Sequence, residues 1–275
     1  MKLRGHEKFP LREGWISKGI KGVLINNRIF NSTDGPDILG VGTNMVKSIR
    51  FWMQSFGLIE DVPKGGVKLS DLGNIVNQKD LYLENDFTLW LLHSNIAKNE
   101  ERTTTWYLFF NKCQADEFRK EELFDFLRKE LIGLTGNDKF SDNSLRDDID
   151  VLLNMYSKNI TDDDPEDKNR SPFASLGLLK KEDDIYYRQQ PSLKKINSKI
   201  VLYELSIMFQ TENSVSIDTI YNLMSSIYFL NKVTLNNYLD DLDNSGYIKV
   251  DRTAGLDIVY PINMALPNKI INDNI

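Results

Sequence analysis

The stretch Thr43–Leu69, TNMVKSIRFWMQSFGLIEDVPKGGVKL, decides the fold prediction. Its apolar residues recur at the spacing of one helix face: Val46, Ile49, Met53 and Phe56. Thr43 is the expected N-cap, and Gly57 is the expected C′ residue after a helix that runs to about Phe56. Leu58–Val62 and Val67–Leu69 then alternate around a Pro-Lys-Gly-Gly turn, the pattern of a β-hairpin.

The residues before and after this stretch predict further helices, which complete the order of elements in this part of the chain. Arg12–Ile25 has apolar residues at helical spacing, and Asp37–Leu39 is a short helix ended by Gly40. From Arg12 to Asn77 the order is therefore helix, short helix, longer helix, hairpin, helix. This order is typical of a helix-turn-helix with a β-wing.

The same order recurs near the other end of the chain. A helix over Ile200–Phe209 is followed by one that Ser216 would cap, and a third ends at Gly246. Two alternating runs, 247–250 and 256–260, would form the second wing. The fold class expected is mainly α with a minor β part, in which two winged helix-turn-helix modules flank a helical middle region.

The expected domains follow from composition. Residues 1–80 form the N-terminal winged module and residues 81–160 a middle domain that reads as helical throughout. Residues 161–195 form a connecting segment, because Thr161–Arg170 has five acidic residues and no apolar period. Residues 196–275 form the C-terminal winged-helix module.

Composition excludes several classes of protein. The 275 residues are 41% hydrophobic and 27% charged, which is an ordinary globular balance. The single cysteine, Cys113, rules out an intrachain disulfide and a Cys-rich zinc site. No apolar run approaches the roughly 20 residues of a membrane span, and the first residues do not resemble a signal peptide. We therefore expect a cytoplasmic protein without a membrane partner.

Charge is unevenly distributed along the chain. Residues 1–70 contain eleven Lys/Arg and six Asp/Glu, a net of +5, whereas the remainder has a net of −11. This asymmetry indicates a basic end that would meet phosphates and an acidic remainder that would not. The alternative is a chance cluster of solvated charges.

Several blocks of sequence resemble one bacterial family. Gly5–Trp15, Leu39–Trp52, Leu83–His93 and Thr104–Asn111 occur in the order typical of the family catalogued as domain of unknown function 4007. The resemblance covers roughly residues 5–180. Ser171 stands where the family leads us to expect a cysteine, so we place no chemistry at that position.

The resemblance implies a functional context that composition and spacing do not provide. Members of this family are similar to components of DNA phosphorothioation and linked phage-defence systems, and one branch resembles a DNA-nicking component. We therefore expect a DNA-binding component of such a system, or more specifically its nicking subunit. Its expected partners are double-stranded DNA, other proteins of the complex and a second copy in a homodimer. The alternatives are a winged-helix transcriptional regulator and a non-enzymatic assembly scaffold.

The expected DNA contacts lie on the basic end. In a helix-turn-helix the later helix enters the major groove, where Asn pairs with adenine and Lys or Arg with guanine or phosphate. A wing-tip lysine would reach the neighbouring backbone. The candidates are Thr43, Asn44, Lys47, Arg50, Gln54, Lys64, Lys68, Arg4, Lys8 and Arg12. The alternative is that these side chains only solvate the helices.

No catalytic residue can be assigned, and no cofactor is expected. A nickase would need a general base or a divalent metal held by carboxylates. The carboxylates considered are Glu84, Asp86, Asp147, Asp148 and Asp150, and no known nuclease or Walker pattern accompanies them. A metal site joining His6 and His93 with Glu7 or Glu84 is a minor hypothesis.

Two further groups of residues favour structural roles. Trp106, Tyr107, Phe109 and Phe110 occur at a helical density that favours core packing over base stacking. Asp240, Asp241 and Asp243 on the last predicted helix would repel phosphates. We therefore interpret the C-terminal module as a protein-binding or dimerisation module.

Overall fold

The computed structural model describes residues 1–157 and 170–275. Of the expected connecting segment 161–195, the acidic residues 162–167 lie outside these ranges. The chain divides into two compact units, Met1–Gln189 and Gln190–Ile275. The finer division into four parts stays a prediction.

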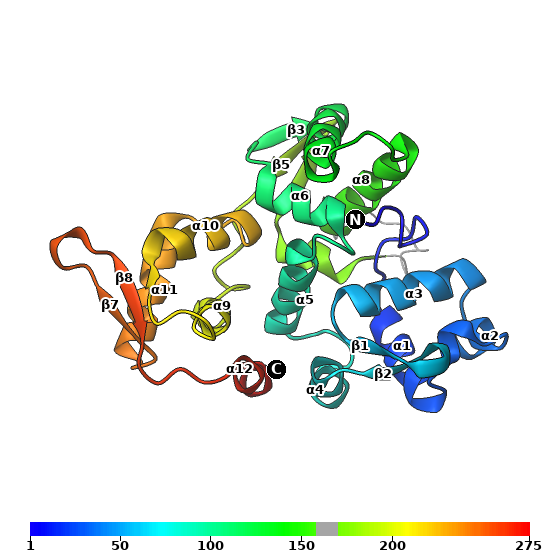
Figure 1. The fold of residues 1–275 in the computed structure, drawn as a ribbon, viewed down its shortest axis with the longest axis horizontal. Coiled ribbons are helices and arrows are strands. Elements are labelled where there is room, and N and C mark those ends of the chain that lie inside the picture. The colour runs from blue at the N-terminus through cyan, green and yellow to red at the C-terminus, as the bar shows by residue number, and fades with distance from the viewer. Residues whose placement is uncertain (158–169) are drawn as a thin grey trace. The chain divides into compact units, whose positions relative to one another are not determined.

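The first part of the N-terminal unit has the predicted order of elements (Figure 1). These elements are α1 (Trp15–Ile25), α2 (Gly35–Leu39), α3 (Thr43–Ser55), β1 (Ile59–Val62), β2 (Gly66–Leu69) and α4 (Asp71–Lys79). β1 and β2 pair antiparallel, with Ile59 opposite Leu69. All four residues of the predicted apolar seam on α3 are buried.

The sequence predicted the C-terminal boundary of α3 correctly but not its N-terminal boundary. Gly57 follows the helix with a φ of 72°, as expected of a C′ glycine. The predicted N-cap is wrong by one residue, because Thr43 is already helical and Gly42 is the N-cap. Gly42 has no side chain to accept a hydrogen bond, so the first amides of α3 have no side-chain cap.

The second part of the N-terminal unit is helical with one small sheet. It contains α5 (Asp86–Lys98), α6 (Thr104–Lys112), β3 (Glu117–Arg119), α7 (Lys120–Thr135), α8 (Asp142–Ser157), β4 (Leu179–Glu182) and β5 (Ile185–Arg188). The strands form an antiparallel sheet in the order β3-β5-β4. The expectation of helix throughout this region is therefore wrong at β3, because residues far along the chain supply its partner strand.

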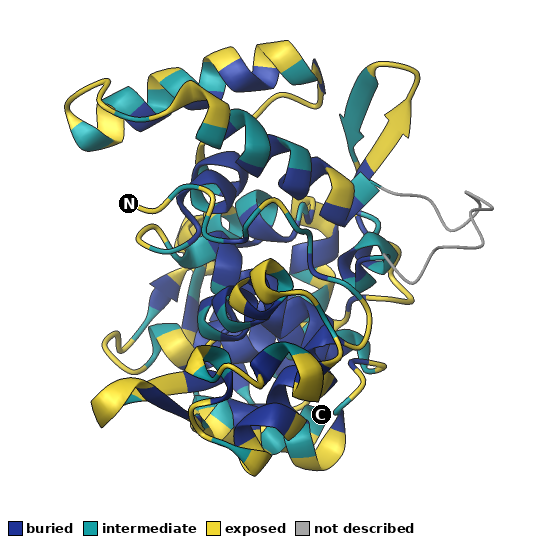
Figure 2. Ribbon diagram, turned by 90° about the vertical axis from the view of Figure 1, so that its right-hand side faces the viewer, coloured by how far each residue is buried: buried dark blue, intermediate teal, exposed yellow. Residues whose placement is uncertain are grey.

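Aromatic side chains make up much of the core of this region. Figure 2 shows that buried residues gather on the inner parts of the ribbon and exposed residues at its edges. Trp106, Phe109 and Phe110 are buried, and Tyr107 is half-buried. Phe110 lies edge-on to Tyr156 of α8, with ring centroids 5.3 Å apart. The interpretation as core residues is confirmed for the three buried rings.

The C-terminal unit repeats the order of three helices and a hairpin. Its elements are α9 (Ser198–Met208), β6 (Val215–Ser216), α10 (Ile217–Ile227), α11 (Lys232–Asn244), β7 (Ile248–Asp251), β8 (Ile258–Pro261) and α12 (Pro267–Asn274). The sheet order is β6-β8-β7. Sequence patterns missed β6, which is two residues long, and α12, which packs on α9.

The chain is thus mainly α-helical with small antiparallel sheets. Within the described ranges, no helix combines the length and the apolarity that crossing a bilayer requires.

The predicted cap of α10 leads to a stability test. Ser216 Oγ accepts a hydrogen bond of 3.1 Å from the Thr219 amide. Ser216→Ala leaves that amide without its cap and should cost about 1 kcal/mol. Hydrogen exchange of the first α10 amides should accelerate by roughly five-fold, whereas Ser245→Ala, at an exposed position, should leave exchange unchanged. Equal exchange in both variants would contradict the capping role.

Candidate nucleic-acid interface

A cationic groove lies between the N-terminal segment and α3. Its volume is about 490 Å³. Three predicted residues from α3 line it, together with residues that precede α1 and with Phe30 and Asn31 of the short 3-10 helix Ile29–Asn31. The charged or amide side chains from α3 and the N-terminal segment are Lys2, Arg4, Glu7, Lys47, Arg50 and Gln54. Four cations therefore face one carboxylate.

The predicted cations differ in how far their charge is compensated. Lys47 and Lys64 are exposed and have no carboxylate partner within the described residues, and Lys47 Nζ donates to Asn44 Oδ1 at 3.3 Å. Four other cations form ion pairs. These pairs are Arg4 and Lys8 with Asp147 at 3.3 and 3.0 Å, and Arg50 with Asp61 and Lys68 with Glu60 at 2.9 Å each. Within the described residues, Lys47, Lys64 and Arg12 are thus the predicted cations without an acidic partner, and of these only Lys47 lines the groove.

Arg50 and Gln54 connect α3 to the hairpin. Arg50 donates from Nη1 to Asn31 at 3.0 Å and from Nη2 to Asp61 of β1 at 2.9 Å. Gln54 Nε2 also donates to Asp61, at 3.0 Å, and Gln54 Oε1 accepts from Arg102 at 2.8 Å. The Arg50 side chain is only 26% exposed. These bonds fix where the hairpin stands relative to α3.

Two residues that follow α1, Arg28 and Asn31, hold the hairpin tip through hydrogen bonds. Lys64 has a φ of 65°, and its carbonyl accepts a hydrogen bond from Arg28 Nε at 3.1 Å. Asn31 Nδ2 donates to the carbonyl of Gly65 at 2.6 Å. The Lys64 side chain is exposed at this tip, outside the groove.

Arg12 lies away from the groove. Its guanidinium packs on the rings of Phe9 and Trp15, at 5.4 and 5.2 Å from their centroids. Partial burial lowers its pKa. Thr43, Asn44, Lys8 and Lys68 also lie outside the groove lining. The structure thus brings Arg4, Lys47, Arg50 and Gln54 together and leaves the other six candidates apart.

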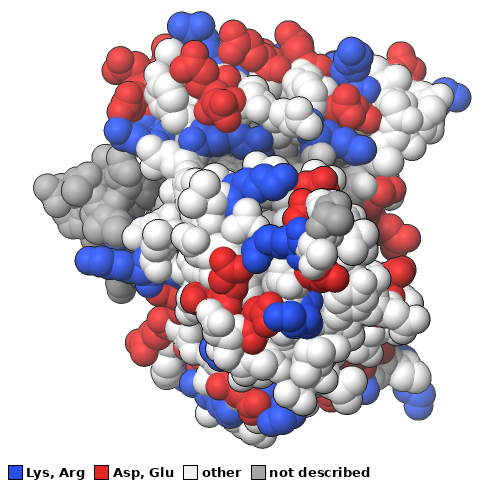
Figure 3. Space-filling view, turned by 90° about the vertical axis from the view of Figure 1, so that its left-hand side faces the viewer, with Lys and Arg blue, Asp and Glu red and all other residues white. Residues whose placement is uncertain are grey.

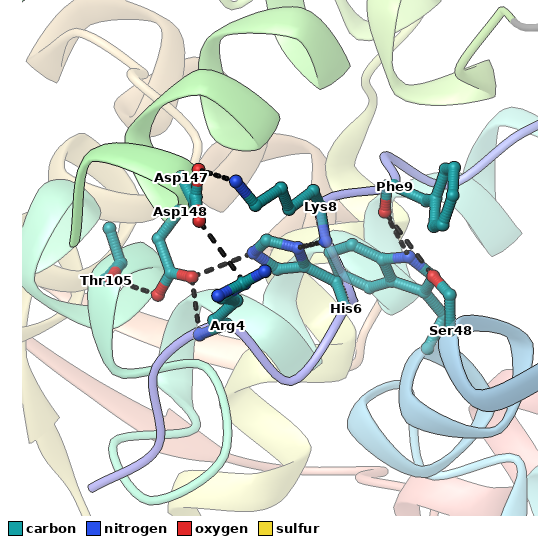
Figure 4. A network of polar contacts seen from close by, with 9 residues as sticks. Arg4, His6, Lys8, Phe9, Ser48, Thr105, Asp147 and Asp148 are labelled. Atoms are coloured by element: carbon teal, nitrogen blue, oxygen red, sulfur yellow. Dashed lines mark hydrogen bonds and ion pairs between the residues drawn. The ribbon is translucent and has the colours of Figure 1, made fainter. Parts of the chain in front are cut away.

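A buried polar network anchors the N-terminal segment (Figure 4). His6 and Asp148 of α8 are 1% and 2% exposed, and His6 Nε2 lies 2.8 Å from Asp148 Oδ1. The Lys8 amide donates a hydrogen bond of 3.1 Å to His6 Nδ1. Because Nδ1 is the acceptor, Nε2 carries the ring hydrogen and donates a hydrogen bond to Asp148. The Arg4 amide and the Thr105 hydroxyl each donate to Asp148 at 2.7 Å.

This arrangement contradicts the minor metal hypothesis. His6 bonds to Asp148, and His93 Nδ1 lies 2.7 Å from the Tyr156 hydroxyl in a different part of the core. Within the described ranges, no group of three His, Cys, Asp or Glu side chains could hold a metal ion. His6 and His93 therefore do not share a site with Glu7 or Glu84.

The carboxylates considered for catalysis are engaged separately. Asp147 pairs with Arg4 and Lys8, whereas Asp150 pairs with Lys120. Asp148 is buried and directed at His6. Asp147 and Asp150, which lie one helical turn apart on α8, therefore contact different cationic side chains. Glu84 is exposed before α5, and Asp86 lies in its first turn.

The C-terminal unit compensates its basic residues with acidic ones. Lys232, Lys249 and Arg252 pair with Asp218, Asp243 and Asp240 at 2.8 to 3.2 Å. A backbone hydrogen bond from Val250 and the bond from Lys249 keep the pKa of Asp243 below its ordinary value. Figure 3 shows a face of the molecule on which cations and anions are interspersed. The two cations of this hairpin, Lys249 and Arg252, are therefore paired with aspartates of α11.

Sequence reasoning missed three residues of the interface. Lys2 belongs to the basic end but precedes every predicted element, and Asn31 lies in a turn. Arg102 lies within hydrogen-bonding distance of Gln54 although 48 residues separate them. Only the charge count pointed to Lys2, and no sequence signal pointed to Arg102.

Comparison with known proteins places this fold in a family. The model of DUF4007, a protein of unknown function, matches residues 3–273, beyond the range covered by the motifs. A magnesium ion-bound crystal structure of SspB and a second SspB crystal structure superpose with TM-scores of 0.86 and 0.85, at 21% and 20% identity. Both superpositions cover 99% of this chain and 86% of the SspB chain, and at this identity they establish the fold alone. No curated protein matches. The chain therefore belongs to the DUF4007 family.

Proposed function

We propose that this protein is a duplex DNA-binding component of a bacterial DNA phosphorothioation and phage-defence system. The observation that carries DNA binding is the groove beside α3, which four cations and one carboxylate line. Two of these cations, Lys2 and Lys47, have no acidic ion-pair partner within the described residues, whereas Arg4 and Arg50 pair with aspartates. Phosphate contacts of this kind supply most of the affinity of proteins for DNA. The system to which the protein contributes is inferred from the family resemblance and from the likeness to SspB.

The N-terminal elements support a winged helix-turn-helix mode of docking. In this mode α3 is the recognition helix, and β1 and β2 form the wing. Asn44 and Lys47 lie near the exposed start of α3, where the backbone amides have no side-chain cap and favour an anion. Lys64 at the hairpin tip would reach the neighbouring phosphate backbone.

Retention of labelled duplex tests this proposal. Two unrelated 20-base-pair duplexes, titrated between 50 and 200 mM salt, should both bind, with affinity falling steeply as salt rises. A transcriptional regulator would instead bind one pseudo-palindrome far more tightly than the other duplex. A scaffold would show no salt-dependent retention of either duplex, and that result would refute the proposal.

The nicking subunit is the more specific form of the proposal. Magnesium is normally held by one or two carboxylates together with waters and substrate phosphates, so it does not require a three-residue protein cluster. Supercoiled plasmid incubated with and without magnesium or manganese should give open-circular product if the chain nicks DNA. Absence of product with every metal would leave a non-enzymatic DNA-binding component.

A further inference from the structure

We infer that the groove is a base-independent site for one phosphodiester of the DNA backbone, bound by Lys2 and Lys47. We infer further that residues 2–8, seated on α3 through Gly5 and on α8 through the buried His6–Asp148 pair, position Lys2 there. Residues 2–8 are called the strap below. The inference rests on the proposed function and adds to it the contact of Lys2, which lies outside the winged elements.

The cations of the groove indicate the chemical class of the ligand. Lys2 and Lys47 have no carboxylate partner within the described residues, whereas Arg4 and Arg50 pair with aspartates. Burial, Arg102 and Arg50 lower the pKa of Lys2, in that order of size, and the Glu7 carboxylate, which also lines the groove, opposes them by a smaller amount. A phosphate placed between these groups would relieve the repulsion among the cations.

The amides that line the groove favour phosphate over bases. Recognition of a base requires free donors and acceptors aimed at its edge. Asn31 already binds Arg50 and the Gly65 carbonyl, and Gln54 already binds Asp61 and Arg102. The groove volume of about 490 Å³ accommodates a phosphodiester with its flanking sugars. The site therefore senses charge and shape.

The strap has a backbone conformation that needs external support. Arg4, Glu7 and Lys8 have φ values of 56°, 50° and 69°, in the left-handed region that disfavours residues with side chains. Asp148 accepts hydrogen bonds from the Arg4 amide and from the His6 ring, and these bonds hold the strap against α8 (Figure 4). The Lys2 amide adds a bond of 3.1 Å to Thr104.

Gly5 lets the strap lie directly on α3. A Cβ at this position would be 2.4 Å from the Phe51 ring and 2.7 Å from Cε of Lys2. Phe51 is itself buried and cannot move aside without cost. The Lys2 ammonium lies 5.3 Å from the centroid of the same ring. Gly5→Ala should therefore lift the strap and remove Lys2 from the groove.

The experiment measures duplex affinity for wild type, Lys2→Ala, Gly5→Ala and the double variant on two unrelated sequences. Each single variant should weaken binding about five- to ten-fold on both sequences and reduce the salt slope by about 0.9. The double variant should bind duplex about as tightly as the single variant with the lower affinity, because Gly5 acts through Lys2 and the two losses should not add. Gly133→Ala is the control, since a Cβ there meets nothing within 4 Å.

The outcomes separate this inference from the proposed function. If wild type binds neither duplex, both fail. If wild type binds and Lys2→Ala binds equally well, the phosphate site is overturned while DNA binding stands. Additive losses in the double variant would overturn the positioning role. Hydrogen exchange gives an independent readout, because the Arg4 and Lys8 amides should exchange faster in Gly5→Ala and unchanged protection would contradict the strap.

Discussion

Reversal of two uncompensated cations, Lys2→Glu together with Lys47→Glu, should reduce duplex affinity by about 100-fold or more at roughly 100 mM salt. Each lysine would lose a charge-assisted phosphate contact, and the glutamates would add repulsion. The slope of log affinity against log salt should decrease in magnitude by about 1.8, which corresponds to the loss of two phosphate contacts. Measurement on two unrelated duplexes should show the same loss on both, since phosphate contacts do not depend on sequence.

A matched variant controls for net charge. Lys129 of α7 and Lys139 in the loop after it are exposed, lie in the same unit and are outside the groove lining. Lys129→Glu with Lys139→Glu changes the net charge by the same amount and should change affinity far less. Equal losses in the two double variants would mean that overall charge governs retention, and the groove would then have no special role.

Arg50 is deliberately left intact in this design. Its guanidinium bonds to Asn31 and Asp61, so a glutamate there would repel Asp61 and loosen the hairpin. A loss of binding in such a variant would mix a disturbed fold with a lost contact. Lys2 and Lys47 are exposed and make no comparable connection, so their replacement tests the interface itself.

The second large effect is expected on stability. Asp148→Ala should reduce the free energy of unfolding of the N-terminal unit by about 3–5 kcal/mol. The substitution leaves the buried His6 ring, the Thr105 hydroxyl and the Arg4 amide without their shared acceptor. All four tryptophans lie in this unit, at positions 15, 52, 90 and 106, so urea unfolding followed by tryptophan fluorescence reports on it alone.

The neighbouring aspartate is the natural control. Asp147 is adjacent to Asp148 on α8, but it pairs with Arg4 and Lys8 at the surface, where their side chains are about half exposed. Such ion pairs contribute roughly 0–1 kcal/mol, so Asp147→Ala should have a small effect. Asp148→Asn keeps an acceptor for His6 and Arg4 and should lie between the two. A loss in Asp147→Ala as large as that in Asp148→Ala would contradict the structural role given to the buried network.

Local patterns in the sequence were sufficient for most elements of the fold. The apolar seam of α3, the hairpin that follows Gly57 and the cap at Ser216 each depend on residues within one or two turns of one another. The β3 strand was missed because its pairing with β5 depends on residues almost seventy positions away. The order of the N-terminal elements was found, whereas their interpretation as a winged DNA-binding module stays a prediction.

In the candidate interface, composition accounts for the excess of positive charge, whereas folding determines which of these charges pair with carboxylates. The excess of cations in residues 1–70 and their identities are properties of composition. Whether a cation is free or paired depends on what folding brings within about 4 Å, as with Arg50 and Asp61 or Arg4 and Asp147. Lys2 lines the groove because His6, Asp148 and Gly5 fix a strained segment whose partners lie on distant helices. Such contacts join residues more than a hundred positions apart, and no local periodicity encodes them.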